Sequence, residues 1–161
     1  MSETSNIHGT GLVLGKHGLL LRGHPGAGKS VITLALLDAW TDRGLPAKLV
    51  SDDRVDISVR NKAVWMHAPD RIAGLIELRG RGIVTRPHVK SARLHLVIDL
   101  VDRLERMVEE DELETELAGI RLPRCPVPKA GVSDGLHQLM LIREAIRALP
   151  PVRGGTRQKT T

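Results

Sequence analysis

The chain contains no phenylalanine and no tyrosine, and Trp40 and Trp65 are its only tryptophans. Its hydrophobic core must therefore be built from leucine, isoleucine, valine and alanine. Proteins that hold single-stranded nucleic acid rely on aromatic side chains on which successive bases stack. The near absence of such side chains argues against a nucleic-acid partner.

Cysteine and long apolar runs are also scarce. The single cysteine, Cys125, excludes an internal disulfide and fits a reducing compartment. No apolar run approaches the ~20 residues of a membrane-spanning helix, so we expect no membrane partner. The opening residues, MSETSNIHGT, lack the apolar stretch of a signal peptide. These absences together predict a cytoplasmic protein with an inert thiol.

The length and charge of the chain suit one domain. Its 161 residues are 41% apolar and 27% charged, which is enough for a single core. We expect one α/β domain over residues 1–149 and a disordered basic tail over residues 150–161. The net charge of +5 could indicate a nucleic-acid surface. However, the excess positive charge lies within residues 1–100, where a nucleotide pocket would explain it.

The most specific motif follows a short apolar run, residues 19–21. The sequence GHPGAGKS matches the phosphate-binding loop G-x-x-x-x-G-K-[ST], and a helix is expected from about residue 28 to residue 42. Backbone N–H groups of such a loop surround phosphate oxygens, and the helix N-terminus adds positive charge. The lysine would reach the β- and γ-phosphates and the serine would bind Mg²⁺. The predicted phosphate-binding residues are Gly23, His24, Pro25, Gly26, Ala27, Gly28, Lys29 and Ser30.

Two adjacent carboxylates end the next apolar segment, residues 47–53. In P-loop proteins an acid at a strand end holds Mg²⁺ through water. Two adjacent aspartates at a strand end point to opposite sides, so one of Asp52 and Asp53 could serve the metal and the other could act as a base. An isolated Asp-Asp pair is more often a solvated turn, but the preceding phosphate loop favours the functional interpretation.

The remaining segments predict a mixed set of strands and helices. We expect a hairpin over residues 6–22, a second hairpin over residues 54–67, strands at 92–101 and 116–123, and a helix over 133–149. Residues 109–116 are acidic and predict a solvated connector. Residues 74–84, GLIELRGRGIV, suit a mobile loop whose Arg79 and Arg81 close on phosphate, although a solvated basic loop is an equal alternative. On pattern alone, His8 is an ordinary surface histidine.

Four elements in order resemble the catalytic domain of HPr kinase/phosphorylase. They are His8-Gly9, GHPGAGKS, LVSDDRVDI and IELRGRGI, the last resembling the family signature E-I-R-G-L-G-I. The resemblance implies a P-loop domain with a mixed β-sheet, similar to that of PEP carboxykinase. It also implies phosphorylation of a serine of HPr, the phosphocarrier of the bacterial sugar phosphotransferase system. We therefore expect an ATP-dependent protein serine kinase.

The resemblance also assigns roles to individual residues. Asp53 would be the base that takes the serine proton, with His8 near it. Lys29 would stabilise the transferring phosphoryl group, and Arg103 resembles a later arginine of the family. Metal ligands would be Ser30, Glu77 and Asp52, holding Mg²⁺ or another divalent cation. Arg79 and Arg81 would belong to the substrate and phosphate loop.

The resemblance further implies partners and two departures from the family pattern. The partners would be HPr, ATP and, for the reverse reaction, phosphate and pyrophosphate; the family also forms homo-oligomers. His8-Gly9 stands almost at the start, so the chain resembles the short alphaproteobacterial form without the N-terminal domain. Residues 126–131, PVPKAG, keep only the first two residues of the family's P-V-R-P-G-R-N stretch, which is tied to phosphorolysis.

Two other functions remain open from the residues alone. One is a P-loop kinase of a small molecule, which would need a lid and an acceptor pocket. The other is a nucleotide-binding regulatory ATPase, which would use the basic surface for salt-dependent binding of nucleic acid.

Overall fold

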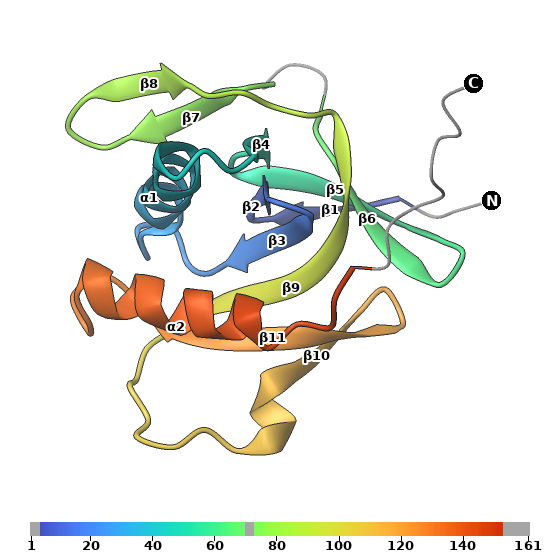
Figure 1. Ribbon diagram of the computed structural model, residues 1–161, viewed down its shortest axis with the longest axis vertical. Coiled ribbons are helices and arrows are strands. Elements are labelled where there is room, and N and C mark those ends of the chain that lie inside the picture. The colour runs from blue at the N-terminus through green and yellow to red at the C-terminus, as the bar shows by residue number, and fades with distance from the viewer. Residues whose placement is uncertain (1–3, 70–72, 153–161) are drawn as a thin grey trace.

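A computed structural model describes residues 4–69 and 73–152, and these residues form a mixed β-sheet with two α-helices on one side (Figure 1). The predicted α/β fold with a mixed sheet is confirmed. The N-terminal strands are β1 (Ser5–His8), β2 (Thr10–Leu14), β3 (His17–Arg22), β4 (Ala47–Ser51), β5 (Arg54–Arg60) and β6 (Ala63–His67). The later strands are β7 (Leu75–Leu78), β8 (Gly82–Thr85), β9 (Ser91–Val101), β10 (Glu114–Leu117) and β11 (Ile120–Pro128).

The order of the strands brings distant segments to one edge of the sheet. The main path runs β1-β5-β6-β9-β3-β2-β4. Outside this path, β11 pairs with residues 97–101 at the carboxyl-terminal end of β9. β3 and β11 both run parallel to β9. β2 is antiparallel to both β3 and β4, so β4 points the same way as β3. The carboxyl ends of β3, β4, β9 and β11 therefore lie at one edge, where ligands bind in open α/β sheets.

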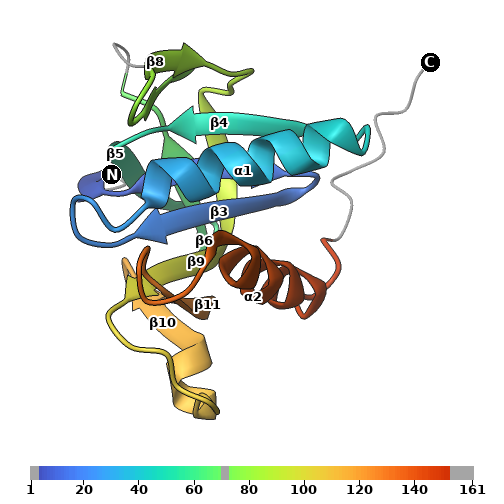
Figure 2. The same cartoon turned by 90° about the vertical axis from the view of Figure 1, so that its left-hand side faces the viewer.

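Two apolar clusters lie on opposite faces of β9. Leu96, Ile98 and Leu100 face helices α1 (Lys29–Asp42) and α2 (Gly135–Arg147), which lie side by side in Figure 2. Leu94 and Val97 belong to a second cluster with residues of β5 and β6. Val97 faces away from Leu96 and Ile98 because side chains alternate along a strand, and the register shift between Leu94 and Leu96 accounts for the place of Leu94 beside Val97. Both clusters are almost entirely aliphatic, as the composition requires.

Helix α1 begins directly after the glycine loop. Gly28 precedes it with φ 101°, a left-handed conformation that favours glycine. Leu37 and Trp40 are buried, whereas Ala35 and Ala39 are only partly buried. The helix lies between the sheet, β7 and α2, so more than one face is covered.

Helix α2 begins where the sequence predicts. The side chain of Asp134 caps it by accepting a hydrogen bond of 2.8 Å from the backbone N–H of His137. Neither helix is long and apolar enough to cross a membrane within the part of the chain that the structure describes. Of the predicted tail, residues 150–152 follow the helix and residues 153–161 lie outside the described residues.

Three local predictions differ from the structure. The first hairpin was expected over residues 6–22 but starts at Thr10. The strand is interrupted at Gly9, and β1 pairs with β5 instead. A Cβ at Gly9 would lie 2.7 Å from the carbonyl oxygen of Leu21, so a side chain there would clash. Residues 74–84 form the β7–β8 hairpin rather than an irregular loop. Within the acidic connector, a 3₁₀ turn (Glu110–Leu113) leads into β10.

Candidate active site

The phosphate loop connects β3 to α1 and is supported from two sides. A Cβ at Gly23 would lie 3.0 Å from Cβ of Leu100, so this glycine permits close packing of the loop on β9. The backbone N–H of Ala130 donates to the carbonyl oxygen of Ala27 over 3.1 Å. The loop is therefore held in shape by β9 and by the segment that follows β11.

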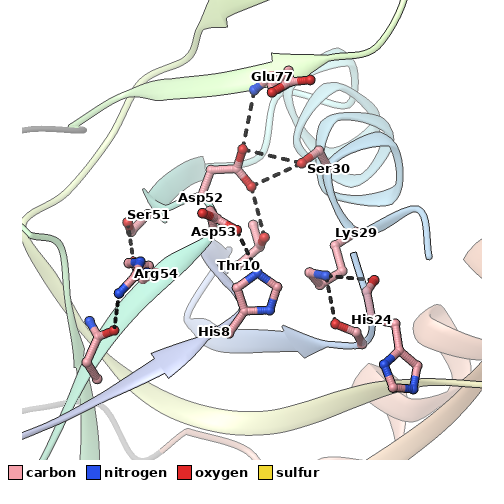
Figure 3. A network of polar contacts seen from close by, with 12 residues as sticks. His8, Thr10, His24, Lys29, Ser30, Ser51, Asp52, Asp53, Arg54 and Glu77 are labelled. Atoms are coloured by element: carbon pink, nitrogen blue, oxygen red, sulfur yellow. Dashed lines mark hydrogen bonds and ion pairs between the residues drawn. The ribbon is translucent and has the colours of Figure 1, made fainter. Parts of the chain in front are cut away.

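The ammonium group of Lys29 lies across the loop. Its Nζ donates to the carbonyl oxygen of Gly23 over 2.8 Å and to that of His24 over 3.2 Å (Figure 3). Burial lowers the pKa of Lys29, and the negative charges of Asp53 and Asp52 oppose this change. A bound phosphate would offer the ammonium a stronger, charged acceptor than these two carbonyls.

Asp52 is the centre of a polar network (Figure 3). The hydroxyl of Ser30 donates to Oδ1 over 3.1 Å, and the hydroxyl of Thr10 donates to the same oxygen over 3.0 Å. The backbone N–H of Glu77 donates to Oδ2 over 3.3 Å. The network thus joins β2, α1, the end of β4 and the β7–β8 hairpin around one carboxylate.

Asp53 points away from this network. Its Oδ1 lies 2.7 Å from Nε2 of His8, and both side chains are largely exposed. Asp53 has φ 71°, and the backbone N–H of Gly9 donates to its carbonyl oxygen over 2.9 Å. The aspartates diverge, as the sequence predicts, but the cause is a left-handed residue in a turn rather than continuation of the strand.

Most of the predicted site residues line one pocket. It contains His8, Pro25, Gly26, Gly28, Lys29, Ser30, Asp52, Asp53, Glu77 and Arg79. Gly23, His24 and Ala27 complete the loop beside it. Arg79 approaches the loop closely, since a Cβ at Gly26 would lie 3.7 Å from its guanidinium. Arg81 is exposed at the β7–β8 turn, and Arg103 lines a separate cavity beside β11.

Thr10 is a site residue that sequence reasoning missed. It is fully buried, and its hydroxyl donates to Oδ1 of Asp52 over 3.0 Å. The available signal was Thr10 itself, a polar residue at the start of the apolar segment TGLVL. A polar residue in that position is equally typical of an ordinary strand end with no role in a site.

The donor atoms around Asp52 fit a small, hard cation. Mg²⁺ prefers oxygen ligands and keeps several waters, so it needs only one or two protein groups. Ser30 and Asp52 supply a hydroxyl and a carboxylate next to the phosphate loop. A cluster of three acidic, histidine or cysteine side chains is not found among the described residues. The site therefore suits a cation shared with phosphate more than one enclosed by protein.

The single cysteine takes no part in this site. Cys125 lies in the core under α2, and burial raises the pKa of its thiol to about 12. The thiol is therefore protonated at neutral pH and inert, as expected.

A strand, a glycine loop and a helix, with an aspartate reaching the loop serine from the neighbouring strand end, define a P-loop nucleotide-binding domain. The chain belongs to the family described as HPr Serine kinase C-terminal domain, whose sequence model matches residues 1–149. The resemblance noted from four motifs is thereby confirmed.

Individual relatives agree with this membership. The HPr kinase/phosphorylase of Streptococcus sanguinis is 30% identical over 141 residues, covering 80% of this chain and 43% of the relative. That of Streptococcus equinus is 30% identical over 158 residues, covering 90% and 48%. The solved Hpr(Ser) kinase/phosphatase from Coxiella burnetii is 30% identical with a TM-score of 0.69, covering 89% of this chain and 91% of that one. The chain thus spans about half the length of the two streptococcal relatives.

Proposed function

We propose that this chain is the catalytic part of an ATP-dependent protein serine kinase that phosphorylates HPr. The observation that carries the proposal is the exposed Asp53–His8 pair, which shares a pocket with Lys29 and Ser30 of the phosphate loop. The pair supplies a base on the outer side of a nucleotide site, where a protein serine can reach it. The names of the relatives support HPr as the substrate.

The proposed reaction transfers the γ-phosphoryl group of ATP to the serine oxygen. Asp53 accepts the hydroxyl proton as the serine oxygen attacks, and His8 holds the Asp53 carboxylate in position. Lys29 and the loop N–H groups balance the charge on the phosphoryl oxygens. A bound Mg²⁺ supplies further positive charge. Ser30 and Asp52 would hold this ion, and Glu77 is the proposed third ligand.

The reverse direction uses the same groups. Protonated Asp53 would return its proton to the serine oxygen while inorganic phosphate takes the phosphoryl group, giving pyrophosphate and free serine. The relatives' names support phosphorolysis. The segment PVPKAG lacks the arginines expected for it, and Lys129 there pairs with Asp102 over 3.0 Å. We therefore propose that the kinase direction dominates.

Three further properties belong to the proposal. A cytoplasmic location is supported by the reduced, buried Cys125. Homo-oligomerisation is supported by exposed apolar side chains on α2, namely Leu136 and Met140. Arg79 and Arg81 are proposed to meet phosphate or substrate from the β7–β8 hairpin, which already touches the loop through Arg79. The comparisons favour neither a small-molecule kinase nor a regulatory ATPase.

The decisive experiment is transfer from γ-labelled ATP to HPr. Label should enter wild-type HPr and should be absent from HPr whose regulatory serine is replaced by alanine. Equal labelling of both proteins would contradict the serine specificity. Failure to label HPr in the presence of Mg²⁺ and bound ATP would contradict the proposed substrate.

A further inference from the structure

A second cavity lies beside strand β11, and we call it the β11 cavity. Its apolar walls come from β9, β11, α2 and the segment after β9: Val101, Leu104, Val108, Pro126, Pro128 and Leu141. Arg103 also lines it. None of the proposed catalytic steps uses this cavity.

The β11 cavity and the phosphate loop occupy the same edge of the sheet. Parallel strands β3, β9 and β11 all end there, and the segments that follow them lie toward one side in Figure 2. Val101 follows Leu100, which packs against Gly23 of the loop. Pro128 is two residues before Ala130, whose N–H bonds to the loop. The cavity wall is therefore joined to the phosphate loop by two short backbone connections.

The chemistry of the β11 cavity suits the flat faces of a nucleobase. Leu104 is 51% exposed and Val108 is 36% exposed, so both present apolar surface that a ligand could cover. Neither tryptophan lines the cavity, and its proline rings and aliphatic side chains provide the flat contacts instead. Small-molecule sites commonly combine such apolar walls with a few polar groups.

Five charged side chains line the cavity, and Arg124 and Asp102 are the two that pair with protein groups among the described residues; the other three are Arg103, Glu105 and Glu112. Arg124, on its floor, donates to Asp99 over 2.6 Å and to the carbonyl oxygen of Glu112 over 2.9 Å. Between the cavity and the loop, the side-chain ammonium of Lys129 pairs with Asp102 over 3.0 Å. The backbone N–H of Lys129 donates to the carbonyl oxygen of Val101. Lys129 is thus a cation, paired with Asp102, on the short connection between the cavity and the loop.

From this arrangement we infer that the β11 cavity binds the nucleoside end of the nucleotide whose phosphates lie in the glycine loop. The inference rests on the proposed function, because it requires a nucleoside triphosphate in the loop. It also gives Arg103 a place beside the nucleoside rather than beside the transferred phosphoryl group. Binding depends on apolar contact with the base more than on hydrogen bonds to its edge.

The test compares ATP with inorganic triphosphate, which has the phosphates and no nucleoside. Binding of each ligand is measured by calorimetry in the presence of Mg²⁺, for wild type and for the double variant L104S/V108S. Loss of these two apolar contacts should weaken ATP binding by about tenfold, and triphosphate binding should stay unchanged. The matched control is M107S, since Met107 lies on the same segment, is 81% exposed and does not line the cavity.

Each outcome bears on one proposal. Unchanged ATP affinity in L104S/V108S would overturn the inference, as would an equal loss for both ligands, which would show an indirect effect on the loop. A loss for ATP in M107S as large as in the double variant would also overturn it. K29A should weaken both ligands. If wild-type protein bound neither ligand, the proposed function itself would fail.

Discussion

Nε2 of His8 lies 2.7 Å from Oδ1 of Asp53, and this contact joins β1 to the turn after β4. The side chains are 45% and 68% exposed, respectively, so the pair stands at the mouth of the nucleotide pocket. An oriented yet accessible carboxylate is what a base for a protein hydroxyl requires. Asp52, one residue earlier, is instead turned toward the phosphate loop.

Replacing Asp53 by asparagine should abolish transfer and leave the nucleotide site intact. The amide keeps the shape of the side chain but cannot accept the proton, and loss of a general base typically lowers the rate by about 10²–10⁴-fold. We expect D53N to lower kcat to that extent with ATP affinity near that of wild type. Retained kinase activity would remove Asp53 from its role.

Replacing His8 by glutamine should have a smaller effect on the same step. Glutamine can still hydrogen-bond to Asp53 but does not reproduce the geometry of the imidazole ring, so kcat should fall by less than in D53N while the KM for ATP stays constant. The control is H67Q, because His67 bonds to Ser58 over 2.6 Å away from the pocket. Equal kinetic changes in H8Q and H67Q would argue against a specific role for His8.

Thr10 should act by positioning Asp52. T10V keeps the volume of the buried side chain but removes its hydrogen bond, so the free energy of unfolding should fall by about 1 kcal/mol. More Mg²⁺ should also be needed for half-maximal activity, because the Asp52 carboxylate loses one of its fixed partners. T10S should restore the Mg²⁺ requirement. If T10V lowered stability with an unchanged Mg²⁺ requirement, Thr10 would have a structural role only.

Asp99 should stabilise the fold in a pH-dependent way. Burial raises the pKa of Asp99, but hydrogen bonds and charge from Arg22 and Arg124 outweigh this and leave the pKa below its usual value. The stabilisation is therefore present above the usual aspartate pKa and is lost as pH falls through the lowered pKa. D99N should cost about 2 kcal/mol at pH 7, less than for a fully buried pair.

Urea unfolding of wild type and D99N at pH 7 and pH 3 provides the measurement. The difference in unfolding free energy between the two proteins should shrink at pH 3. A difference that did not depend on pH would show that the carboxylate charge contributes nothing. Glu114, which pairs with Arg121 on the surface, offers the control E114Q.

His95 should destabilise the fold in mild acid. Burial, and then the nearby His17 and Arg93, lower the pKa of His95 from 6.5 to about 4. Its Nδ1 accepts a hydrogen bond of 2.9 Å from the backbone N–H of Gly18, which requires an unprotonated nitrogen. Between pH 6.5 and 4 the unfolded chain binds the proton more readily, so stability should fall as pH falls through this range.

The substitution H95Q should flatten this dependence. Glutamine can accept the Gly18 hydrogen bond through its side-chain oxygen without titrating. Thermal unfolding from pH 7 to pH 4.5 compares the two proteins. A slope in H95Q as steep as in wild type would assign the acid sensitivity to other groups.

Some of the site could be predicted because its signals are local. The glycine loop needs only eight consecutive residues, and the strand and helix beside it are also encoded by neighbouring positions. The divergence of Asp52 and Asp53 was predicted for the wrong reason, since a strand period cannot reveal the positive φ of Asp53. The β7–β8 hairpin was mistaken for a loop because its glycines and arginines concealed two short strands.

By itself, the sequence determined the class of the protein, the phosphate-binding loop and the identity of the acidic pair, because these depend on residues close together in the chain. The family resemblance implied that His8 lies near Asp53, but only the tertiary structure gave the 2.7 Å contact of this pair and the contact of Thr10 with Asp52, across separations of 45 and 42 residues. It also placed Arg103 at the β11 cavity, outside the pocket that holds Lys29. These contacts follow from the order and direction of paired strands, which local periodicity does not specify.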